Sequence, residues 1–423
     1  MMKPSDRFKQ PSCADDHEPG ARRVDAARND ILEHLHPVRG IEKHALRDAL
    51  NRVLAADILS PANVPGHDNS AMDGYAVRGT DLDENERPHL RLIGNLHAGQ
   101  RFDGECRPGE CIRIMTGAPM PAGADTVIMQ EQARVIDATT VEIVGRHRHG
   151  ENVRLAGEDI ARGAAVLERG RRLTPADIGI LASLGIAEVG VFRRPRVAFF
   201  STGDELRSLG ETLNEGDVFD SNRYSLYGML KQLDVELLDL GVIRDDPSRL
   251  REAFSSAAAI ADVIVTSGGV SVGEADFTRE TLEALGTMNF WKILMKPGRP
   301  LSFGHIGDTA FFGLPGNPVA VMVTFYQFVQ PALRYLASGR TEAPLTLLAR
   351  STQAIRKRPG RYEFPRGIFH IDDNGEASVA TTGQQGSGIL TSMSRGNCFI
   401  LLPEDNAGVE AGEQVSIQPF ASY

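Results

Sequence analysis

One stretch of the chain, Thr266–Asp276, combines glycines, hydroxyl groups and carboxylates at close spacing. The apolar and β-branched residues Val263–Thr266 lead into it, which predicts a buried strand that ends in a glycine-rich turn. Glycines allow positive φ angles and bring backbone N–H groups close to an anion. The turn closes with two carboxylates, Glu274 and Asp276. Amide hydrogens beside acid oxygens favour an anionic ligand that is bridged by a divalent cation.

Carboxylates also follow two other predicted strands. Val197–Phe200 precedes the pair Asp204-Glu205, and Val235–Leu240 precedes the pair Asp245-Asp246. Because parallel strands bring their carboxyl ends to one edge of a sheet, we expect these acids to gather there with Asp276. Clustered like charges are costly unless a cation or a positively charged ligand neutralises them.

Not all of these acids need to bind a ligand. Asp204 and Asp246 fit equally well as N-caps of following helices, which is an ordinary role for aspartate. Glu205, Asp245 and Asp276 are therefore the candidate functional carboxylates.

Positive charge is concentrated in the segment Trp291–Pro300. Lys292, Lys296 and Arg299 lie within eight positions, and Pro297 stiffens the backbone between them. Lysine acts as a point charge and arginine as a planar fork, and both suit phosphate. A solvated surface loop is the alternative, but the flanking apolar residues hold these cations near a core.

A fourth candidate is the turn Pro315-Gly316-Asn317-Pro318, which precedes the apolar run Val319–Val329. At the start of a helix such a turn presents backbone N–H groups to an anion. It serves equally well as a rigid entry into a buried helix, since the apolar run is too short to span a bilayer. Two further polar loops, Pro65–Ala76 and Met115–Pro121, show no catalytic motif on chemical grounds alone.

Strands and helices alternate from Arg196 to about Leu336, and this pattern predicts parallel βαβ crossovers in a doubly wound sheet. Short β-type runs between Asn63 and Arg154 indicate a small inserted β domain. Further short β runs after Pro344 indicate a compact C-terminal β domain without a convincing helix. The expected division is a flexible leader (1–20), an N-terminal helical and extended domain (21–62 and 155–192), the inserted β domain (63–154), the doubly wound domain (193–338) and the C-terminal β domain (339–423).

Composition narrows the function further. The 423 residues carry a net charge of −10, which argues against general binding to nucleic acids or to anionic membranes. The first twenty residues lack the apolar core of a secretory signal. Four scattered cysteines without a CxxC pair are typical of a reducing cytoplasm. We therefore expect a cytoplasmic protein.

Seven motifs in order identify the chain, from about Val24 to Phe420, as similar to the molybdopterin molybdenumtransferase family, the group that includes the gephyrin E domain. The motifs are Asp68-Asn-Ser-Ala-Met-Asp-Gly-Tyr-Ala, Met115-Thr-Gly-Ala-Pro, Ser201-Thr-Gly-Asp-Glu-Leu, Asp220-Ser-Asn-Arg, Ser267-Gly-Gly-Val-Ser-Val-Gly, Lys296-Pro-Gly-Arg-Pro and Leu314-Pro-Gly-Asn-Pro. Arg299 stands where many members of the family have lysine, which keeps the charge.

The resemblance implies an elongated four-domain homodimer. It places each cleft between the doubly wound domain of one subunit and the β insertion and tail of the other. The implied reaction is Mg²⁺-dependent hydrolysis of adenylylated molybdopterin, release of AMP and transfer of molybdate to the dithiolene. The residues that would line the cleft are Asp68, Thr116, Arg154, Asp159, Glu205, Asp245, Asp276, Lys292, Lys296, Pro315, Pro318 and Ser387.

Roles for these residues follow as hypotheses. Glu205, Asp245 and Asp276 would hold Mg²⁺ or position the attacking water, and Lys292 and Lys296 would stabilise charge on the phosphates. Asp68 and Asp159 join this catalytic group, while Arg154 and Ser387 would bind molybdate. Contacts to the pterin phosphate or the nucleotide would come from Thr116, Ser267, Gly268, Gly269, Ser271, Gly273, Arg299, Pro315, Gly316 and Pro318.

Two other functions compete with this interpretation. One is a molybdopterin adenylyltransferase, which shares the doubly wound domain but lacks the additional domains. As separate proteins, an adenylyltransferase and downstream molybdoenzyme maturation factors are the expected partners, the first as donor of the substrate and the second as receivers of the product. A non-catalytic scaffold like the gephyrin E domain would not need the intact acids and lysines. A general nucleotide hydrolase is disfavoured because the chain has no Gly-Lys-Ser/Thr phosphate loop.

Overall fold

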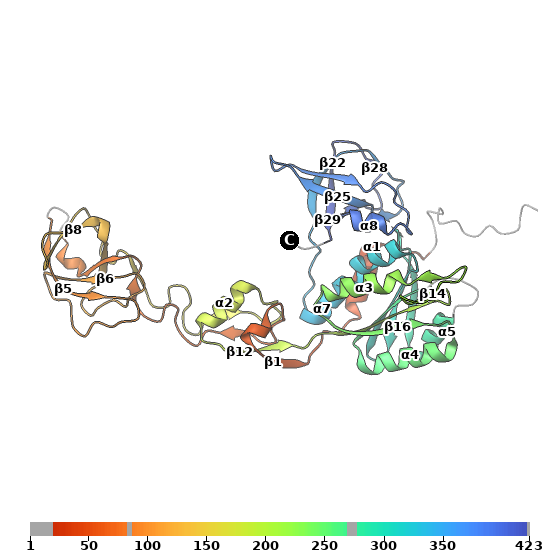
Figure 1. Cartoon of the computed structure of the whole chain (residues 1–423), viewed down its shortest axis with the longest axis horizontal. Helices are drawn as coiled ribbons and strands as arrows, with labels where there is room; N and C mark the ends of the chain where they lie inside the picture. The colour runs from red at the N-terminus through yellow and green to blue at the C-terminus, as the bar shows by residue number, and fades with distance from the viewer. Residues whose placement is uncertain (1–19, 83–86, 269–276, 421–423) are drawn as a thin grey trace, which may run out of the picture. The chain divides into compact units, whose positions relative to one another are not determined.

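The computed structural model describes residues 20–82, 87–268 and 277–420 (Figure 1). The chain forms two compact units, one of which comprises Ile41–Val191 and the other the residues on both sides of that segment. The second unit contains the doubly wound domain and the C-terminal β domain.

A six-stranded mixed sheet forms the centre of the second unit, as the alternation of strands and helices predicted. Its strand order is β16-β13-β17-β21-β20-β18. The first four strands are parallel, and β20 and β18 are antiparallel to their neighbours. The strands are β13 (Arg196–Thr202), β16 (Glu236–Ile243), β17 (Val263–Ser267), β18 (Thr287–Lys292), β20 (Pro300–Ile306) and β21 (Thr309–Leu314).

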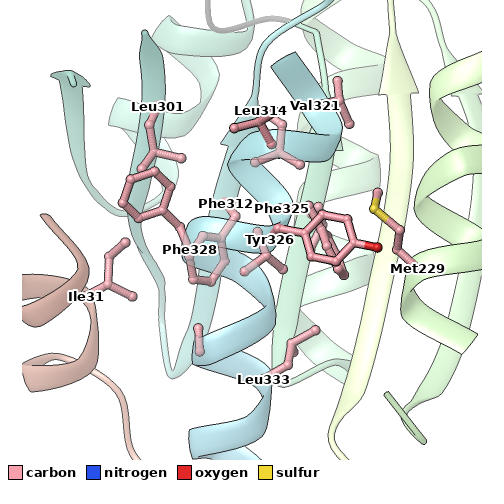
Figure 2. Close-up of a cluster of buried hydrophobic side chains, with 14 of the residues drawn as sticks. Ile31, Met229, Leu301, Phe312, Leu314, Val321, Phe325, Tyr326, Phe328 and Leu333 are labelled. Carbon is pink, nitrogen blue, oxygen red and sulfur yellow. The ribbon is translucent and has the colours of Figure 1, made fainter. Parts of the chain in front are cut away.

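Helices cover both faces of this sheet because alternate residues of each buried strand point to opposite sides. Val197 and Phe199 of β13 belong to one apolar cluster, and Ala198 and Phe200 belong to another. The first cluster includes α3 (Ser221–Lys231) and the helices that follow β21, and Figure 2 shows part of it. The second includes α4 (Pro247–Ile260) and α5 (Phe277–Leu285). The doubly wound prediction is confirmed.

The buried helix expected over Val319–Val329 is longer than its apolar run. It begins as α6 (Pro318–Thr324), widens to a π-helical turn, η5 (Phe325–Val329), and continues as α7 (Gln330–Ser338). Pro331 explains the change because it has no N–H to donate to the carbonyl of Gln327 four residues earlier. That carbonyl accepts instead from Nε of Arg28 at 3.1 Å.

The N-terminal helix α1 (Val24–Glu33) differs from expectation. We expected it to pack with residues 155–192, but Val24, Ala27 and Ile31 are buried in the core of the second unit. The helix contacts η5 and α7. Its apolar stripe is complementary to those helices, a match that local sequence does not reveal.

The C-terminal domain is a closed barrel with strand order β22-β26-β25-β27-β29. It also contains a short helix, α8 (Thr391–Arg395), where none was expected. Its strands are β22 (Leu347–Ser351), β25 (Arg366–Ile371), β26 (Ala377–Thr381), β27 (Cys398–Leu401) and β29 (Gln414–Pro419), with the short β23 (Ile355–Arg356), β24 (Tyr362–Glu363) and β28 (Gly408–Val409) beside them.

Aromatic rings join this barrel to the doubly wound domain of the same chain. The centroid of the Phe399 ring lies 5.5 Å from the ring centroid of Tyr326, 4.6 Å from that of Phe420 and 6.1 Å from that of Phe364. Strand β24 also pairs in parallel with β19 (Met295–Lys296). The resemblance implied a tail that reaches the partner's cleft, whereas this barrel packs on its own chain.

The other unit contains the inserted β domain, a six-stranded sheet with order β7-β4-β6-β5-β9-β8. These strands are β4 (Gly74–Val77), β5 (His89–Leu96), β6 (Glu110–Ile114), β7 (Thr126–Met129), β8 (Ala133–Val135) and β9 (Thr140–Ile143). The segments on either side of the insertion pair with each other as short strands. The pairs are β1 (Ile41–Ala45) with β12 (Glu188–Phe192) and β2 (Ile58–Leu59) with β11 (Ala165–Leu167). A short 3₁₀ turn, η2 (Leu46–Ala49), follows β1.

Helix α2 (Pro175–Ser183) has Thr174 as its N-cap and Pro175 at its first position. The structure adds a capping box in which Asp177 accepts from the backbone N–H and the hydroxyl of Thr174 at 2.9 and 2.8 Å. Arg171 contacts the same carboxylate through Nε at 3.0 Å and Nη2 at 2.9 Å.

This buried carboxylate predicts an acid-sensitive contribution to stability. Burial alone would raise the pKa of Asp177, but the hydrogen bonds from Arg171 and Thr174 outweigh it and lower the pKa. Because the folded pKa lies below the unfolded value of about 3.9, the stabilisation is complete well above that pH and is lost as the pH falls through the folded pKa. Asp177→Asn should cost about 2 kcal/mol at pH 7. Chemical unfolding at several pH values should show this difference shrinking below pH 4, and a difference that does not depend on pH would contradict the assignment.

In the described ranges no helix has the length and apolarity needed to cross a membrane. Cys106, Cys111 and Cys398 are buried free thiols. Burial raises the pKa of Cys106 to about 11 and the pKa of each of the other two to about 12, so all three thiols stay protonated and unreactive near neutral pH.

Candidate active site

A cavity of about 1640 Å³ opens in the second unit at the carboxyl ends of the parallel strands. One wall comes from the doubly wound domain and the other from the C-terminal barrel. This is where ligands bind in open α/β sheets, and the volume exceeds that of a usual small-molecule pocket of about 300–1,000 Å³.

Two of the three candidate carboxylates, Glu205 and Asp245, line this cavity. They follow β13 and β16, which are neighbours in the sheet, so the expected convergence is present for this pair. The third, Asp276, lies outside the described residues, as do Gly269, Ser271 and Gly273. Among the residues that the structure describes, no group of three acids, histidines or cysteines is arranged to hold a metal ion.

The neighbouring acids have structural roles. Asp246 is the N-cap of α4 and accepts from the backbone N–H groups of Ser248 and Arg249, both at 3.0 Å. Asp204 caps no helix, because the chain there enters the short parallel pair β14 (Leu206–Arg207) and β15 (Val218–Phe219). Its Oδ1 accepts instead from the backbone N–H of Asp245 at 3.4 Å.

The start of the glycine-rich turn is tightly built. Gly268 lines the cavity with φ +89°, and a Cβ at this position would lie 2.5 Å from the carbonyl oxygen of Thr202. Its N–H donates to the carbonyl of Leu314 at 3.1 Å, while Ser267 is buried beneath it. Among the residues that the structure describes, the hydroxyl oxygens of Thr202 and Thr266 are buried here and have no hydrogen-bond partner. Buried orphan groups of this kind are typical of a ligand or water site.

Two of the three predicted cations, Lys296 and Arg299, line the cavity. Lys292 is the exposed last residue of β18 and is not among the lining residues. Gly298 lies between the cavity cations at φ +94°, where a Cβ would lie 2.5 Å from the hydroxyl of Thr324. This close contact fixes the segment against α6.

Lys296 contributes charge that is largely exposed to solvent. Its Nζ lies 3.6 Å from Oε1 of Glu363, and its side chain is 59% exposed. If the cavity binds AMP, as the family resemblance implies, Lys296→Gln should weaken that binding about fivefold, because one unit charge about 4 Å from an anion contributes about 1 kcal/mol in water-like surroundings. Titration calorimetry at two salt concentrations should show a smaller difference at high salt. Lys231→Gln, on the surface of α3, is the matched control and should bind AMP as the wild type does.

The proline turn forms another part of the same wall. Pro315 and Gly316 line the cavity, whereas Pro318 is the first residue of α6 and is not in the lining. The predicted site residue Ser387 also lines it, from the barrel. Its carbonyl accepts from the backbone N–H of Val319 at 3.0 Å, so the two segments are bonded to each other.

The sequence reasoning missed the basic residues of the barrel wall. Arg356, Lys357, Arg358 and Arg361 all line the cavity opposite Glu205 and Asp245. The signal was present as a basic run in an acidic chain, a pattern that indicates an anion-binding surface.

The sequence also did not indicate Arg366, which lies behind the cavity wall and is not in the lining. Its side chain is only 1% exposed, and burial lowers its pKa to about 10. The guanidinium donates to the hydroxyl of Ser392 at 3.0 Å and to the carbonyl of Gly386 at 3.2 Å. Arg366 therefore fixes the backbone beside Ser387.

The remaining predicted residues belong to the other unit, where hydrogen bonds connect three of their segments. Asp68 accepts from the backbone N–H of Ala156 at 2.7 Å, and Arg154 is paired with Asn69 between β10 (Val153–Arg154) and β3 (Asn69–Ser70). The loop of Thr116 is bonded to the same segment through Gly117 N–H and Ser70 O.

Thr116 is occupied within its own unit. Its backbone N–H and its hydroxyl both donate to Oδ1 of Asp73 at 2.7 Å, and these bonds lower the pKa of Asp73. Asp159 follows nearby, with its N–H bonded to the carbonyl of Val64. The two polar loops, which showed no catalytic motif in the sequence, are thus hydrogen-bonded to each other.

Comparison with known proteins agrees with this architecture. Residues 22–185 match the MoeA N-terminal region (domain I and II), residues 198–335 a probable molybdopterin binding domain, and residues 349–420 the MoeA C-terminal region (domain IV). The crystal structure of the molybdopterin biosynthesis moeA protein from Pyrococcus horikoshii is 31% identical, with a TM-score of 0.83 over 95% of this chain and 100% of that one.

Curated relatives extend over nearly the whole chain. The molybdopterin molybdenumtransferase of Haemophilus influenzae is 44% identical over 94% of this chain and 98% of its own length. That of Bacillus subtilis is 34% identical over 88% of each, and the gephyrin of Dictyostelium discoideum is 32% identical over 93% of this chain and 61% of its own length. The matches include the N-terminal and C-terminal domains that an isolated adenylyltransferase would lack. The chain therefore belongs to the molybdopterin molybdenumtransferase family.

Proposed function

We propose that this protein hydrolyses adenylylated molybdopterin with the help of Mg²⁺, releases AMP and transfers molybdate to the dithiolene. The observation that supports this most directly is the composition of the cavity. Glu205 and Asp245 line the wall from the doubly wound domain. Six lysine and arginine side chains are also in the lining, against three further acids, Glu363, Glu410 and Glu413. A phosphoanhydride substrate requires carboxylates that bind a metal ion and cationic side chains that bind its phosphates.

The donor set fits Mg²⁺. The ion prefers oxygen ligands and is usually held by one or two carboxylates, with water and substrate phosphates completing its shell. Glu205 and Asp245 would hold it, with Asp276 as the third proposed ligand. When bound, the ion would neutralise developing charge on the phosphate oxygens.

The other residues bind and orient the substrate. Lys296 and Arg299 would stabilise negative charge on the phosphates as the phosphoanhydride bond breaks, and we assign Lys292 to the same task. The backbone at Gly268, Pro315 and Gly316 would contact the substrate. Ser387 would donate to molybdate, an oxyanion that requires donors.

We further propose that the protein acts as a cytoplasmic homodimer. In this arrangement the surface formed by Asp68, Thr116, Arg154 and Asp159 would complete the cleft of a second copy. A molybdopterin adenylyltransferase would supply the substrate, and maturation factors of molybdoenzymes would receive the product.

AMP release from purified adenylylated molybdopterin, with Mg²⁺ and with or without molybdate, tests the proposal. Molybdate-dependent release supports it. Formation of pyrophosphate from ATP and molybdopterin would instead show an adenylyltransferase. Absence of any release, together with a large assembly in size-exclusion chromatography, would favour a scaffold.

A further inference from the structure

A buried amide, that of Asn222 in the first turn of α3, is hydrogen-bonded to two segments next to the cavity. Its Nδ2 donates to Oγ of Ser267 at 2.8 Å and to the carbonyl oxygen of Gly316 at 2.7 Å, and the residue is 9% exposed. Ser267 immediately precedes the glycine-rich turn, and Gly316 belongs to the proline turn. Asn222 thus connects the two turns whose glycines, Gly268 and Gly316, line the cavity.

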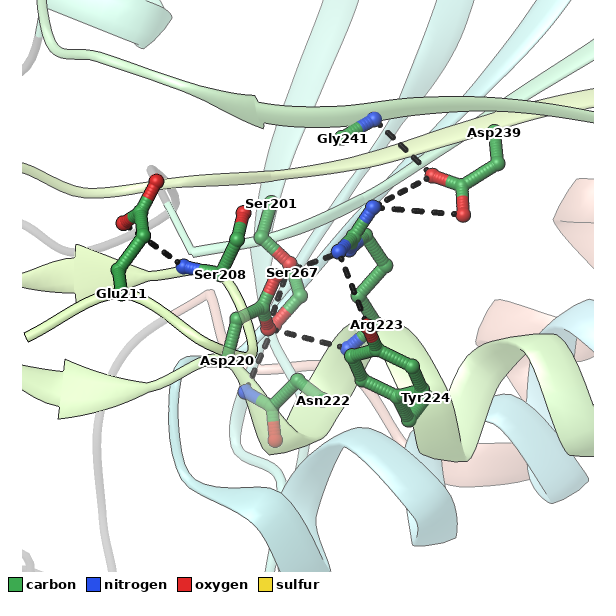
Figure 3. A network of polar contacts seen from close by, with 10 residues as sticks. All are labelled: Ser201, Ser208, Glu211, Asp220, Asn222, Arg223, Tyr224, Asp239, Gly241 and Ser267. Atoms are coloured by element: carbon green, nitrogen blue, oxygen red, sulfur yellow. Dashed lines mark hydrogen bonds and ion pairs between the residues drawn. The ribbon is translucent and has the colours of Figure 1, made fainter.

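The first turn of α3 is itself fixed to the sheet. Asp220 is its N-cap and accepts from the backbone N–H of Arg223 at 3.1 Å and from the hydroxyl of Ser201 at 3.0 Å (Figure 3). Ser201 lies in β13, next to β17, and β17 lies next to β21. The asparagine therefore extends from an anchored helix end to the ends of two further strands.

We infer that Asn222 is a positioning residue that fixes Ser267 and Gly268, after β17, and the proline turn relative to each other, in the arrangement that binds the phosphate of the nucleotide. This inference rests on the proposed function, since it concerns the same cavity. An amide is suited to the task because its NH₂ group supplies two hydrogens, one for each turn. Ser267 accepts through its oxygen and so keeps its own proton to donate.

Substitution should separate positioning from simple stabilisation. Asn222→Asp keeps the shape but replaces the NH₂ donor with an acceptor, so that the Gly316 carbonyl loses its donor and the Ser267 hydroxyl has to donate instead of accept. Asn222→Leu removes the donors without adding charge, and Asn222→Ala serves if the leucine variant does not fold. Gln327→Leu is the matched control, because Gln327 is a buried amide of the same unit that donates to Oε1 of Gln418 at 2.8 Å, outside the cavity lining.

AMP, the nucleotide product of the proposed reaction, is the probe. The dissociation constant, measured by calorimetry well below the unfolding temperature, should rise at least about tenfold for both Asn222 variants, equivalent to about 1.4 kcal/mol. The AMP dissociation constant of Gln327→Leu should stay within about twofold of the wild-type value, even if its unfolding temperature falls as far as those of the Asn222 variants. Hydrogen exchange should accelerate in peptides that contain Gly268 and Gly316 in the Asn222 variants alone.

Each contrary outcome is informative. The positioning role would be overturned by unchanged AMP affinity or by unchanged hydrogen exchange at the two turns. It would also be overturned by a loss of affinity in Asn222→Asp alone, because that result would indicate an effect of the added charge. A wild-type protein that neither binds nor releases AMP would refute the proposed function instead. Hydrogen exchange would then still decide whether Asn222 couples the two turns.

Discussion

Glu205→Gln is expected to slow AMP release by about 10²–10³-fold, the usual cost of losing one group that stabilises charge in a transition state. Glu205 lines the cavity where β13 ends, beside Asp245. Glutamine has the same size and hydrogen-bonding reach but carries no charge, so it is a much poorer ligand for a hard cation. The initial rate of AMP release at saturating Mg²⁺ is the measurement.

The dependence on Mg²⁺ separates two roles for this carboxylate. If Glu205 holds the ion, the variant should require a higher Mg²⁺ concentration for half-maximal rate. If it positions water, kcat should fall with the Mg²⁺ requirement unchanged. Glu211→Gln is the control, because Glu211 is an exposed acid in the β14–β15 connection whose carboxylate accepts from the backbone N–H of Ser208 at 3.1 Å. A Glu205→Gln variant that keeps more than half of the wild-type rate would remove Glu205 from the active site.

Phe399→Ala is expected to destabilise the second unit by about 3–5 kcal/mol, as is typical for truncating a buried phenylalanine. Phe399 is fully buried and contacts the rings of Tyr326, Phe364 and Phe420, which come from both domains. Its loss would leave a cavity where the barrel meets the doubly wound domain. Urea unfolding of the full chain, followed by tryptophan fluorescence at Trp291, measures the effect.

Phe369→Ala provides the comparison within the same barrel. Phe369 is partly buried against the internal cluster of the barrel, not in the contact with the doubly wound domain. Its truncation should cost less and leave AMP affinity intact, whereas Phe399→Ala should also weaken AMP binding because the barrel forms one cavity wall. A cost below about 1 kcal/mol for Phe399→Ala would show that these rings do not anchor the barrel.

The sequence predicted the doubly wound domain well, because its signals are local. The stripe Leu226, Met229, Leu230 and Leu233 has helical spacing, and all four residues are buried against the sheet. Thr174 followed by Pro175 is a local pattern typical of a helix start, and α2 begins at Pro175. The convergence of Glu205 and Asp245 also followed from local pattern, because parallel strands end at one edge of a sheet.

Contacts between distant segments were decided only by the tertiary structure. Nothing in the sequence near Val24 indicates that its helix packs on η5. There, Nε of Arg28 donates to the carbonyl of Gln327, which Pro331 cannot do because it has no N–H. The basic barrel wall and the bonds of Asn222 likewise join residues tens of positions apart. Local sequence determines which elements form and which side chains can do chemistry. The fit of one apolar surface to another determines which of them meet, because burial depends on the shape of both partners.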